Sequence, residues 1–161
     1  MIPRRVAFLA VLVACLPYAG PAQAQGANGA ASTMADTRAR NAHGFAIVAN
    51  PYTGNAAAIA EGADLFADKA CSGCHGPAGG GGMCPPVVND AWAYGSDDTT
   101  LFNLIKLGSV ALQAKGYARG AAEKIAGDMP PFGGMLSDDE TWKLIAWIRS
   151  KYAGDPAKRN W

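Results

Sequence analysis

The chain has 161 residues, half of them hydrophobic, and its 14 basic and 13 acidic side chains give a formal net charge of +1. This length accommodates one domain with appended segments, and the near-zero charge excludes a nucleic-acid-binding protein that depends on a basic surface. The 20 glycines and 10 prolines predict long connections between few helices, so the protein core is expected to be thin.

The first 24 residues have the order of a secretory signal peptide. Arg4 and Arg5 precede an apolar run from Val6 to Leu16, and the small-residue sequence Ala-Gln-Ala ends at Ala24. A basic start, a hydrophobic stretch and a small-residue cleavage site are the three parts of such a signal. We therefore expect cleavage after Ala24 and a periplasmic mature chain, which loses two of the 14 basic residues and keeps all 13 acidic ones.

A second interpretation of this region stays open, because Leu12-Val13-Ala14-Cys15 resembles the lipobox of a bacterial lipoprotein. Acylation of Cys15 would anchor the chain to a membrane, and membrane contact is expected only in that case. No apolar window after residue 16 is long enough to span a bilayer. Without acylation, the mature chain is expected to be soluble.

Residues 25–55 are expected to form a flexible arm followed by an extended strap. The arm, residues 25–42, has few large apolar groups and cannot bury enough surface to order itself. The strap, residues 43–55, is expected to lie against the domain through its larger side chains, which are Phe45, Ile47, Val48 and Tyr52. The domain itself is expected to occupy residues 56–152, with an exposed tail at residues 153–161.

The first helix is predicted over Ala56–Ala70. Ile59, Gly62, Ala63 and Phe66 recur there at helical spacing. A glycine in a helix interior costs about 1 kcal/mol relative to alanine, so Gly62 indicates that another helix approaches closely at this position.

The motif Cys71-Ser72-Gly73-Cys74-His75 follows this helix and is typical of a c-type haem attachment site. Two intervening residues place both sulfurs on one turn, where each can form a thioether with a haem vinyl group, and His75 can then ligate the iron. Zinc sites and thioredoxin-like sites share the Cys-x-x-Cys spacing. The adjoining histidine and the export signal favour haem, and the single motif indicates one haem.

The remaining elements alternate loops with two longer helices. Residues 76–82 are too glycine-rich for anything but a loop, and an irregular, partly apolar stretch follows the prolines at positions 85 and 86. Asp97 or Asp98 can cap a helix that is expected to stop at Gly108. Residues 109–128 are expected to hold one short helix within a long connection.

The last helix is predicted to begin at a capping box. Ser137 occupies the N-cap position and Glu140 stands three residues into the helix. The helix is expected to run to Lys151 or Tyr152. Its apolar face contains Trp142, Leu144, Ile145, Trp147 and Ile148.

A haem iron has a second axial position, for which Met129 is the preferred candidate. The chain between His75 and Met129 is long enough to pass around a haem edge, and the following proline favours an extended backbone at Met129. Met83 follows a glycine run that is expected to hold a ligand loosely, and Met135 lies at the entrance to the last helix. His43 or an open position are the remaining alternatives.

Three further residues are expected to touch the cofactor. The carbonyl of Pro85 is the predicted acceptor for the second ring nitrogen of His75, which would fix the tautomer of the imidazole. Trp92 and Tyr94 can pack on the haem edge while their N–H and O–H groups reach the propionates. A role as ordinary core aromatics is an equal alternative for both.

From about Ala56 to Tyr152, the chain resembles the class I c-type cytochromes. The resemblance rests on Gly62 and Phe66 in the first helix, the haem motif, Pro85, and the pair Leu144 and Trp147 in the last helix. It implies an all-α fold in which the N- and C-terminal helices cross beside one covalently bound haem c. It also implies an electron-transfer protein rather than an enzyme.

Within this family, four further segments are similar to the cytochrome c-L group, the electron acceptors of quinoprotein alcohol dehydrogenases. They are Gly81-Gly82-Met83, Trp92-Ala93-Tyr94-Gly95, Met129-Pro130-Pro131-Phe132-Gly133 and Glu140-Thr141-Trp142-Lys143. The similarity implies that electrons come from a pyrroloquinoline quinone (PQQ) methanol or alcohol dehydrogenase, with lanthanide-dependent enzymes among the candidates. Another cytochrome c or an oxidase would be the acceptor. Cys84, where the family often has glycine, departs from the pattern, as does the long stretch 109–128.

Two alternatives to a free electron carrier stay open. The first is a haem enzyme or gas sensor with a labile distal ligand, because the motif alone specifies attachment and not chemistry. The second is a cytochrome subunit of a membrane-associated oxidase or dehydrogenase, which the N-terminal arm and Cys15 would suit.

Overall fold

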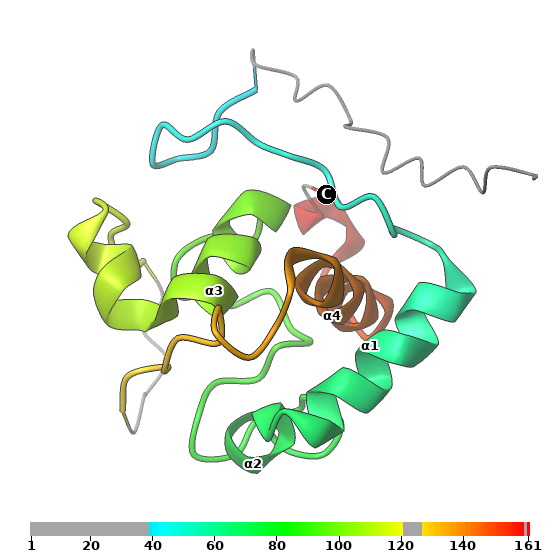
Figure 1. Ribbon diagram of the computed structural model, residues 1–161. Helices are drawn as coiled ribbons and strands as arrows, with labels where there is room; N and C mark the ends of the chain where they lie inside the picture. Colours follow the sequence, from blue (N-terminus) through cyan, green and yellow to red (C-terminus); the bar gives the residue numbers. More distant parts are fainter. Residues whose placement is uncertain (1–38, 121–126, 160) are drawn as a thin grey trace, which may run out of the picture. The chain divides into compact units, whose positions relative to one another are not determined.

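The computed structural model describes residues 39–120, 127–159 and 161. Within these ranges the chain forms helices and no strand, apart from an isolated bridge between Arg40 and Ala46. The helices are α1 (Ala56–Asp68), α2 (Cys71–His75), α3 (Asp98–Ala114), α4 (Asp138–Ser150) and the short 3-10 helix η1 (Pro156–Lys158). This helical architecture is the expected all-α class (Figure 1).

Several predictions fall on the remaining residues. The signal peptide, Cys15 and most of the arm lie outside the described residues, and so do residues 121–126 of the long connection. These stay predictions. No helix among the described residues is long and apolar enough to cross a bilayer.

Helices α1 and α4 cross at a glycine (Figure 1). A Cβ atom at Gly62 would lie 2.2 Å from the backbone oxygen of Lys143 and 2.9 Å from the Cβ atom of Trp147. Beside this contact, the rings of Phe66 and Trp147 pack with their centroids 4.3 Å apart. The close helix approach expected from Gly62 is confirmed, and the crossing forms the centre of the main hydrophobic cluster.

Replacement of Gly62 by alanine is expected to destabilise the protein by about 3 kcal/mol, the upper end of the usual cost of overpacking a core. The added methyl group meets backbone of α4, which cannot rotate away, so the helices must separate. Denaturant titration of the haem-loaded protein measures this change. Gly134→Ala is the matched control because a Cβ atom there meets nothing within 4 Å; equal losses in both variants would contradict the packing explanation.

Side chains cap the helices at positions that the sequence indicates. At α4, Ser137 and Glu140 form both halves of the capping box. Of the two candidates at α3, Asp97 is the N-cap, and its carboxylate accepts a hydrogen bond from the Thr100 N–H at 2.9 Å. Asp98, which is almost fully buried like Asp97, instead pairs with Arg149 of α4.

The first helical run of α3 ends at Gly108, as the sequence predicts, and a second run continues to Ala114 within the bounds of α3. Gly108 interrupts it with φ of 73° and ψ of 168°, and the helix resumes at once. The glycine is therefore a break inside one helix, and the short helix expected in 109–128 follows that break directly.

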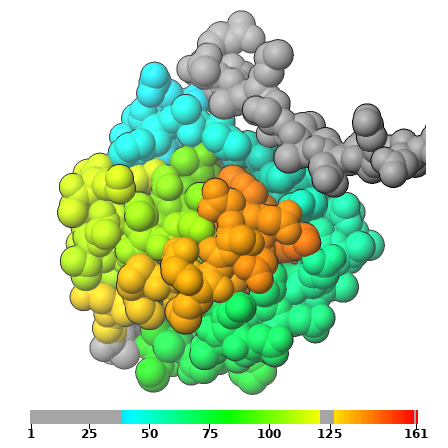
Figure 2. Space-filling model, viewed as in Figure 1, coloured from blue at the N-terminus to red at the C-terminus, as the bar shows by residue number. Residues whose placement is uncertain are grey.

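The strap and the tail both pack on the helical domain. Figure 2 shows the first strap residues (cyan) on the outer surface of the domain, and the Val48 N–H donates to the Thr99 hydroxyl at 2.7 Å. Most described residues of the tail are exposed, as expected, and its last residue packs on the domain. Although η1 is exposed, the ring of Trp161 lies 4.9 Å from that of Tyr152 and 3.8 Å from the guanidinium carbon of Arg149.

Candidate functional site

An apolar pocket contains the preferred candidates that the sequence indicates for cofactor binding. Its walls come from α2, the loop after α2, α3 and the loop before α4. The nominated residues that line it are Cys71, Cys74, His75, Pro85, Trp92, Tyr94 and Met129. Further lining comes mostly from apolar side chains, among them Val87, Leu101, Leu104, Pro130 and Phe132.

Helix α2 is a single turn that presents the two cysteines. It starts after Ala70, which adopts a left-handed conformation with φ of 61° and lets the chain turn sharply from α1 into α2. Cys71 is buried and Cys74 is half-buried, and both are free thiols. Burial raises the pKa of the Cys71 thiol, so this side chain is held as a neutral group in apolar surroundings.

His75 is oriented by the loop that follows it. Its Nδ1 atom lies 2.7 Å from the carbonyl oxygen of Pro85. A carbonyl can only accept, so Nδ1 carries a proton, and the lone pair of the neutral ring is then on Nε2. The imidazole is therefore in the tautomer that binds a metal through Nε2, with the second-sphere hydrogen bond that such ligands usually make.

The glycine loop 76–82 is tied back onto α2 by backbone hydrogen bonds. The Gly81 N–H donates to the His75 carbonyl at 2.8 Å, and the Cys84 N–H donates to the Cys74 carbonyl at 3.1 Å. The glycine content predicts a loose loop, and this prediction is wrong. The glycines permit a tight fold that the hydrogen bonds hold. Met83, at the end of this loop, is 60% exposed and does not line the pocket.

Met129 lines the pocket from a loop that is fastened to the break in α3. Its N–H donates to the Ser109 hydroxyl at 3.1 Å, and its carbonyl accepts from the Ser109 N–H at 2.9 Å. A Cβ atom at Gly108 would lie 2.6 Å from the Met129 oxygen. The interruption of α3 therefore frees backbone groups to hold Met129 and makes room for its carbonyl.

The other candidates for an axial ligand lie elsewhere. Met135 is 56% exposed, and neither it nor His43 lines the pocket. The Nε2 atom of His43 donates to the carbonyl of Tyr94 at 2.7 Å. Among the methionines in the described ranges, only Met129 faces the same pocket as His75.

Trp92 and Tyr94 line the pocket and also pack in the domain. The Tyr94 hydroxyl accepts a hydrogen bond from Gln113 Nε2 at 3.0 Å, and its ring is buried. The ring of Trp92 stacks with that of Tyr152 at 6.5 Å and lies 5.3 Å from the guanidinium of Arg149. The two roles considered for these aromatics are therefore compatible.

Sequence reasoning missed Gly108 and Ser109 as site residues. Both act through Met129, whose backbone they accommodate and bind. The only signal in the sequence was the glycine itself, which was interpreted as a helix end. In the sequence, nothing distinguishes Ser109 from a surface serine. Its role depends on hydrogen bonds with Asp128 and Met129, about twenty residues further along the chain.

The donor set fits a covalently attached haem better than a simple metal ion. Two thiols on one turn, an imidazole with a free Nε2 and a thioether share an apolar pocket. Across the part of the chain that the structure describes, no group of three or more His, Cys, Asp or Glu side chains could hold a metal ion. A zinc site built from Cys71 and Cys74 therefore lacks its remaining ligands.

Comparison with known proteins supports the same assignment. The sequence model of the family described as cytochrome C oxidase, cbb3-type, subunit III, matches residues 57–148. Among curated proteins, cytochrome c-L of Methylorubrum extorquens is 33% identical over 112 residues, which cover 70% of this chain and 49% of the relative. The cbb3-type cytochrome c oxidase subunit FixP of Sinorhizobium medicae is 32% identical over 105 residues, which cover 65% of this chain and 33% of the relative.

Solved structures of two cytochromes c-L resemble the fold. The protein from Methylophaga aminisulfidivorans has a TM-score of 0.53 and 32% identity, with 68% of this chain and 63% of that chain covered. The protein from Hyphomicrobium denitrificans has a TM-score of 0.53 and 33% identity, with 69% and 57% covered. The matched regions span a third to a half of the length of the curated relatives, so the likeness concerns part of each.

Proposed function

The chain belongs to the c-type cytochromes of the family described as cytochrome C oxidase, cbb3-type, subunit III, with covalently bound haem c as cofactor, and from this premise we propose that it is a mono-haem electron carrier. The observation that carries the proposal is the shared pocket of His75 and Met129. An iron ligated by both side chains has no position left for a substrate.

Each residue of the pocket has a separate task in this function. Cys71 and Cys74 would hold the cofactor through thioethers, and His75 would bind the iron through Nε2 while Pro85 keeps its ring oriented. Met129 would supply the other protein ligand to the iron. When bound, haem c supplies an iron that alternates between Fe(III) and Fe(II) by taking up and releasing one electron. The apolar walls exclude water from it.

Carbon monoxide binding to the reduced protein tests the proposal. With Met129 on the iron, binding should be slow and incomplete, because the thioether must leave first. Rapid and complete binding would instead favour the haem enzyme or gas sensor. The sulfur-to-iron charge-transfer band of the oxidised protein gives an independent measurement of the same ligand.

We further propose that the electron donor is a PQQ-dependent methanol or alcohol dehydrogenase, lanthanide-dependent forms included. The support is the similarity to cytochromes c-L in both sequence and structure. Another cytochrome c or an oxidase would accept the electron. Stopped-flow mixing of the oxidised protein with a reduced dehydrogenase tests the donor, and failure with every PQQ dehydrogenase tried would refute this partner but leave the carrier function intact.

A role as a fixed subunit of a membrane oxidase is the second candidate. It is favoured by the family match and by the similarity to FixP. The two candidates differ in the exported N-terminus, which mass spectrometry can identify. A free residue after Ala24 supports a mobile periplasmic carrier, whereas an acylated Cys15 supports an anchored subunit.

Substitution of Ser109 by alanine is expected to loosen Met129 without removing it. The Met129 N–H would lose its hydroxyl acceptor, and Asp128 would lose the hydrogen bond that Ser109 donates at 2.8 Å. We expect imidazole to displace the methionine about fivefold more readily, since one hydrogen bond contributes roughly 1 kcal/mol. Spectral titration of the oxidised protein with imidazole measures this, and Ser150→Ala, at the end of α4, is the control.

A further inference from the structure

Cys84 is a third cysteine at the haem attachment site. It lines the same pocket as Cys71, Cys74 and His75 and is half-buried. The proposed attachment uses only the first two cysteines. Cys84 therefore remains a thiol beside the cofactor, with no part in holding it.

The side chains of Cys84 and Cys74 both line this pocket. Their backbones are joined as well, because the Cys84 N–H donates to the Cys74 carbonyl at 3.1 Å. Gly82 makes this closure possible, since a Cβ atom there would lie 2.7 Å from the same carbonyl oxygen. The loop 76–82 thus returns the chain to the second cysteine of the motif.

Cys71 does not share this contact with Cys84. Its sulfur faces the carbonyl of Lys69, at 3.9 Å, and it is more deeply buried than Cys84. Cys74 accordingly has two cysteine neighbours, one three residues before it and one beside it across the glycine loop. The contacts that place Cys84 there are backbone hydrogen bonds within a short segment.

We propose that Cys84 is a site of redox modification, at which a disulfide with Cys74 forms in the exported chain before haem attachment and blocks the second thioether until it is reduced. The inference rests on the proposed use of Cys71 and Cys74 for haem. Exported proteins encounter conditions in which disulfides form and persist, and adjacent thiols are the ones that pair.

The reaction balances with a disulfide oxidant. Cys74 and Cys84 each release a proton and together release two electrons as their sulfurs bond. A dithiol-disulfide oxidoreductase, or a small-molecule disulfide, takes up the electrons and protons and becomes two thiols. The reverse exchange with a dithiol reductant frees Cys74 for attachment and leaves Cys84 as a thiol in the finished protein.

The sequence itself allows this bond to be detected. Trypsin releases residues 70–106 as one peptide with all three cysteines, and cyanogen bromide then cuts after Met83, between Cys74 and Cys84. The full chain is exported from cells without haem-attachment machinery, quenched with acid, alkylated with N-ethylmaleimide and digested. We expect the two fragments to remain joined until a reductant is added.

Two variants and the haem-loaded protein complete the test. The joined fragments should persist in Cys71→Ser and disappear in Cys74→Ser. The proposal would be overturned by fragments that separate in the unsubstituted chain, or by fragments that stay joined in Cys74→Ser. In the haem-loaded protein, residues 70–83 should carry haem and Cys84 should be alkylated. Haem on another peptide would refute the attachment site instead, so the two failures are distinguishable.

Discussion

Replacement of Met129 by alanine is expected to abolish the sulfur-to-iron charge-transfer band and to let carbon monoxide bind the reduced protein rapidly. The reduction potential should fall on the order of 0.2 V, within the range of ~0.8 V over which axial ligands tune haem iron. The reason is chemical: a thioether sulfur favours Fe(II), so its loss favours Fe(III). Redox titration followed by the visible spectrum measures the shift.

The two exposed methionines provide matched controls for this experiment. Met83→Ala and Met135→Ala remove the same side chain from positions outside the pocket. Both variants should keep the charge-transfer band and the potential of the parent protein. A band that survives in Met129→Ala and vanishes in either control would show that the axial ligand was assigned to the wrong methionine.

The residues that could be nominated from the sequence are those whose chemistry depends on local spacing. Cys71, Cys74 and His75 stand on one turn, and the capping box of Ser137 and Glu140 spans three residues. Gly62 was informative because a glycine inside a helix has a cost that needs a reason. These signals extend over one or two helical turns, and the structure contains each feature.

The features that the sequence did not reveal depend on contacts between distant segments. Gly108 has the signature of a helix end, and only the Met129 loop, about twenty residues later, explains why α3 resumes after it. The polar residues of the tail predict an exposed segment, and most of its described residues are exposed. Its last residue, Trp161, nonetheless packs against the guanidinium group of Arg149 on α4. The spacing of residues in the tail gives no sign of this contact.

The glycine run before Met83 predicts a loose loop that would hold a ligand poorly. The run is instead fixed by hydrogen bonds to α2, and Met83 is disfavoured because the fixed loop directs it toward solvent. Glycine content reports the conformations that a loop can adopt, and the backbone partners decide whether it moves.

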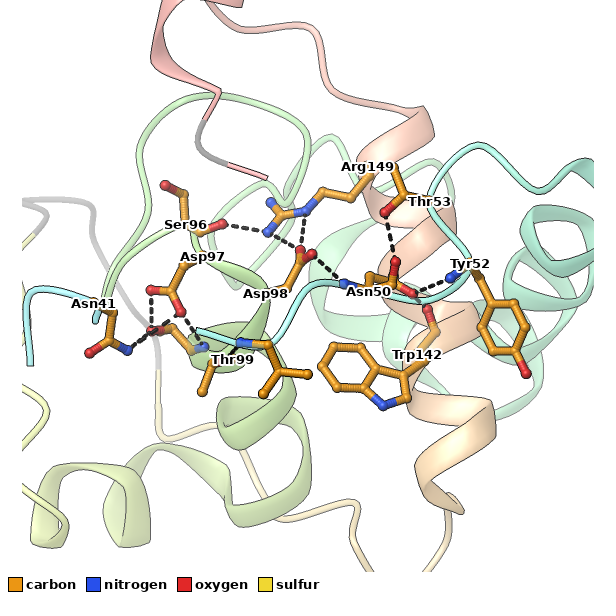
Figure 3. Close-up of polar contacts among 12 residues, drawn as sticks. Asn41, Asn50, Tyr52, Thr53, Ser96, Asp97, Asp98, Thr99, Trp142 and Arg149 are labelled. Carbon is orange, nitrogen blue, oxygen red and sulfur yellow. Dashed lines mark hydrogen bonds and ion pairs between the residues drawn. The ribbon is translucent and has the colours of Figure 1, made fainter. Parts of the chain in front are cut away.

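The largest loss of stability is expected at a buried ion pair that joins the strap, α3 and α4 (Figure 3). Arg149 Nε and Nη2 donate to Asp98 Oδ1 at 2.9 and 2.7 Å, and the other carboxylate oxygen accepts from the Asn50 N–H at 2.9 Å. The two charged side chains are only 4% and 3% exposed. Burial lowers the pKa of Arg149, and Asp98 opposes that shift.

Asp98→Ala is expected to lower the free energy of unfolding by about 4 kcal/mol, since removal of one partner leaves a buried charge without compensation. Asp138→Ala is the matched control. Asp138 is likewise the first residue of its helix and pairs with Lys106, but its side chain is 75% exposed, so the loss should stay below about 1 kcal/mol. Denaturant titrations of the haem-loaded variants compare the two directly.

A second substitution shows whether the loss of stability comes from the unpaired charge of Arg149 or from the other contacts that Asp98 makes. Addition of Arg149→Met to Asp98→Ala removes the uncompensated guanidinium and should recover part of the lost stability. The reason is that replacing both members of a buried ion pair by apolar residues costs far less stability than removing only one member. Arg149→Met alone would leave the carboxylate with only the Asn50 N–H as a described partner. If the double variant were less stable than Asp98→Ala, the packing of Arg149 between Trp92 and Trp161 would contribute more than its charge.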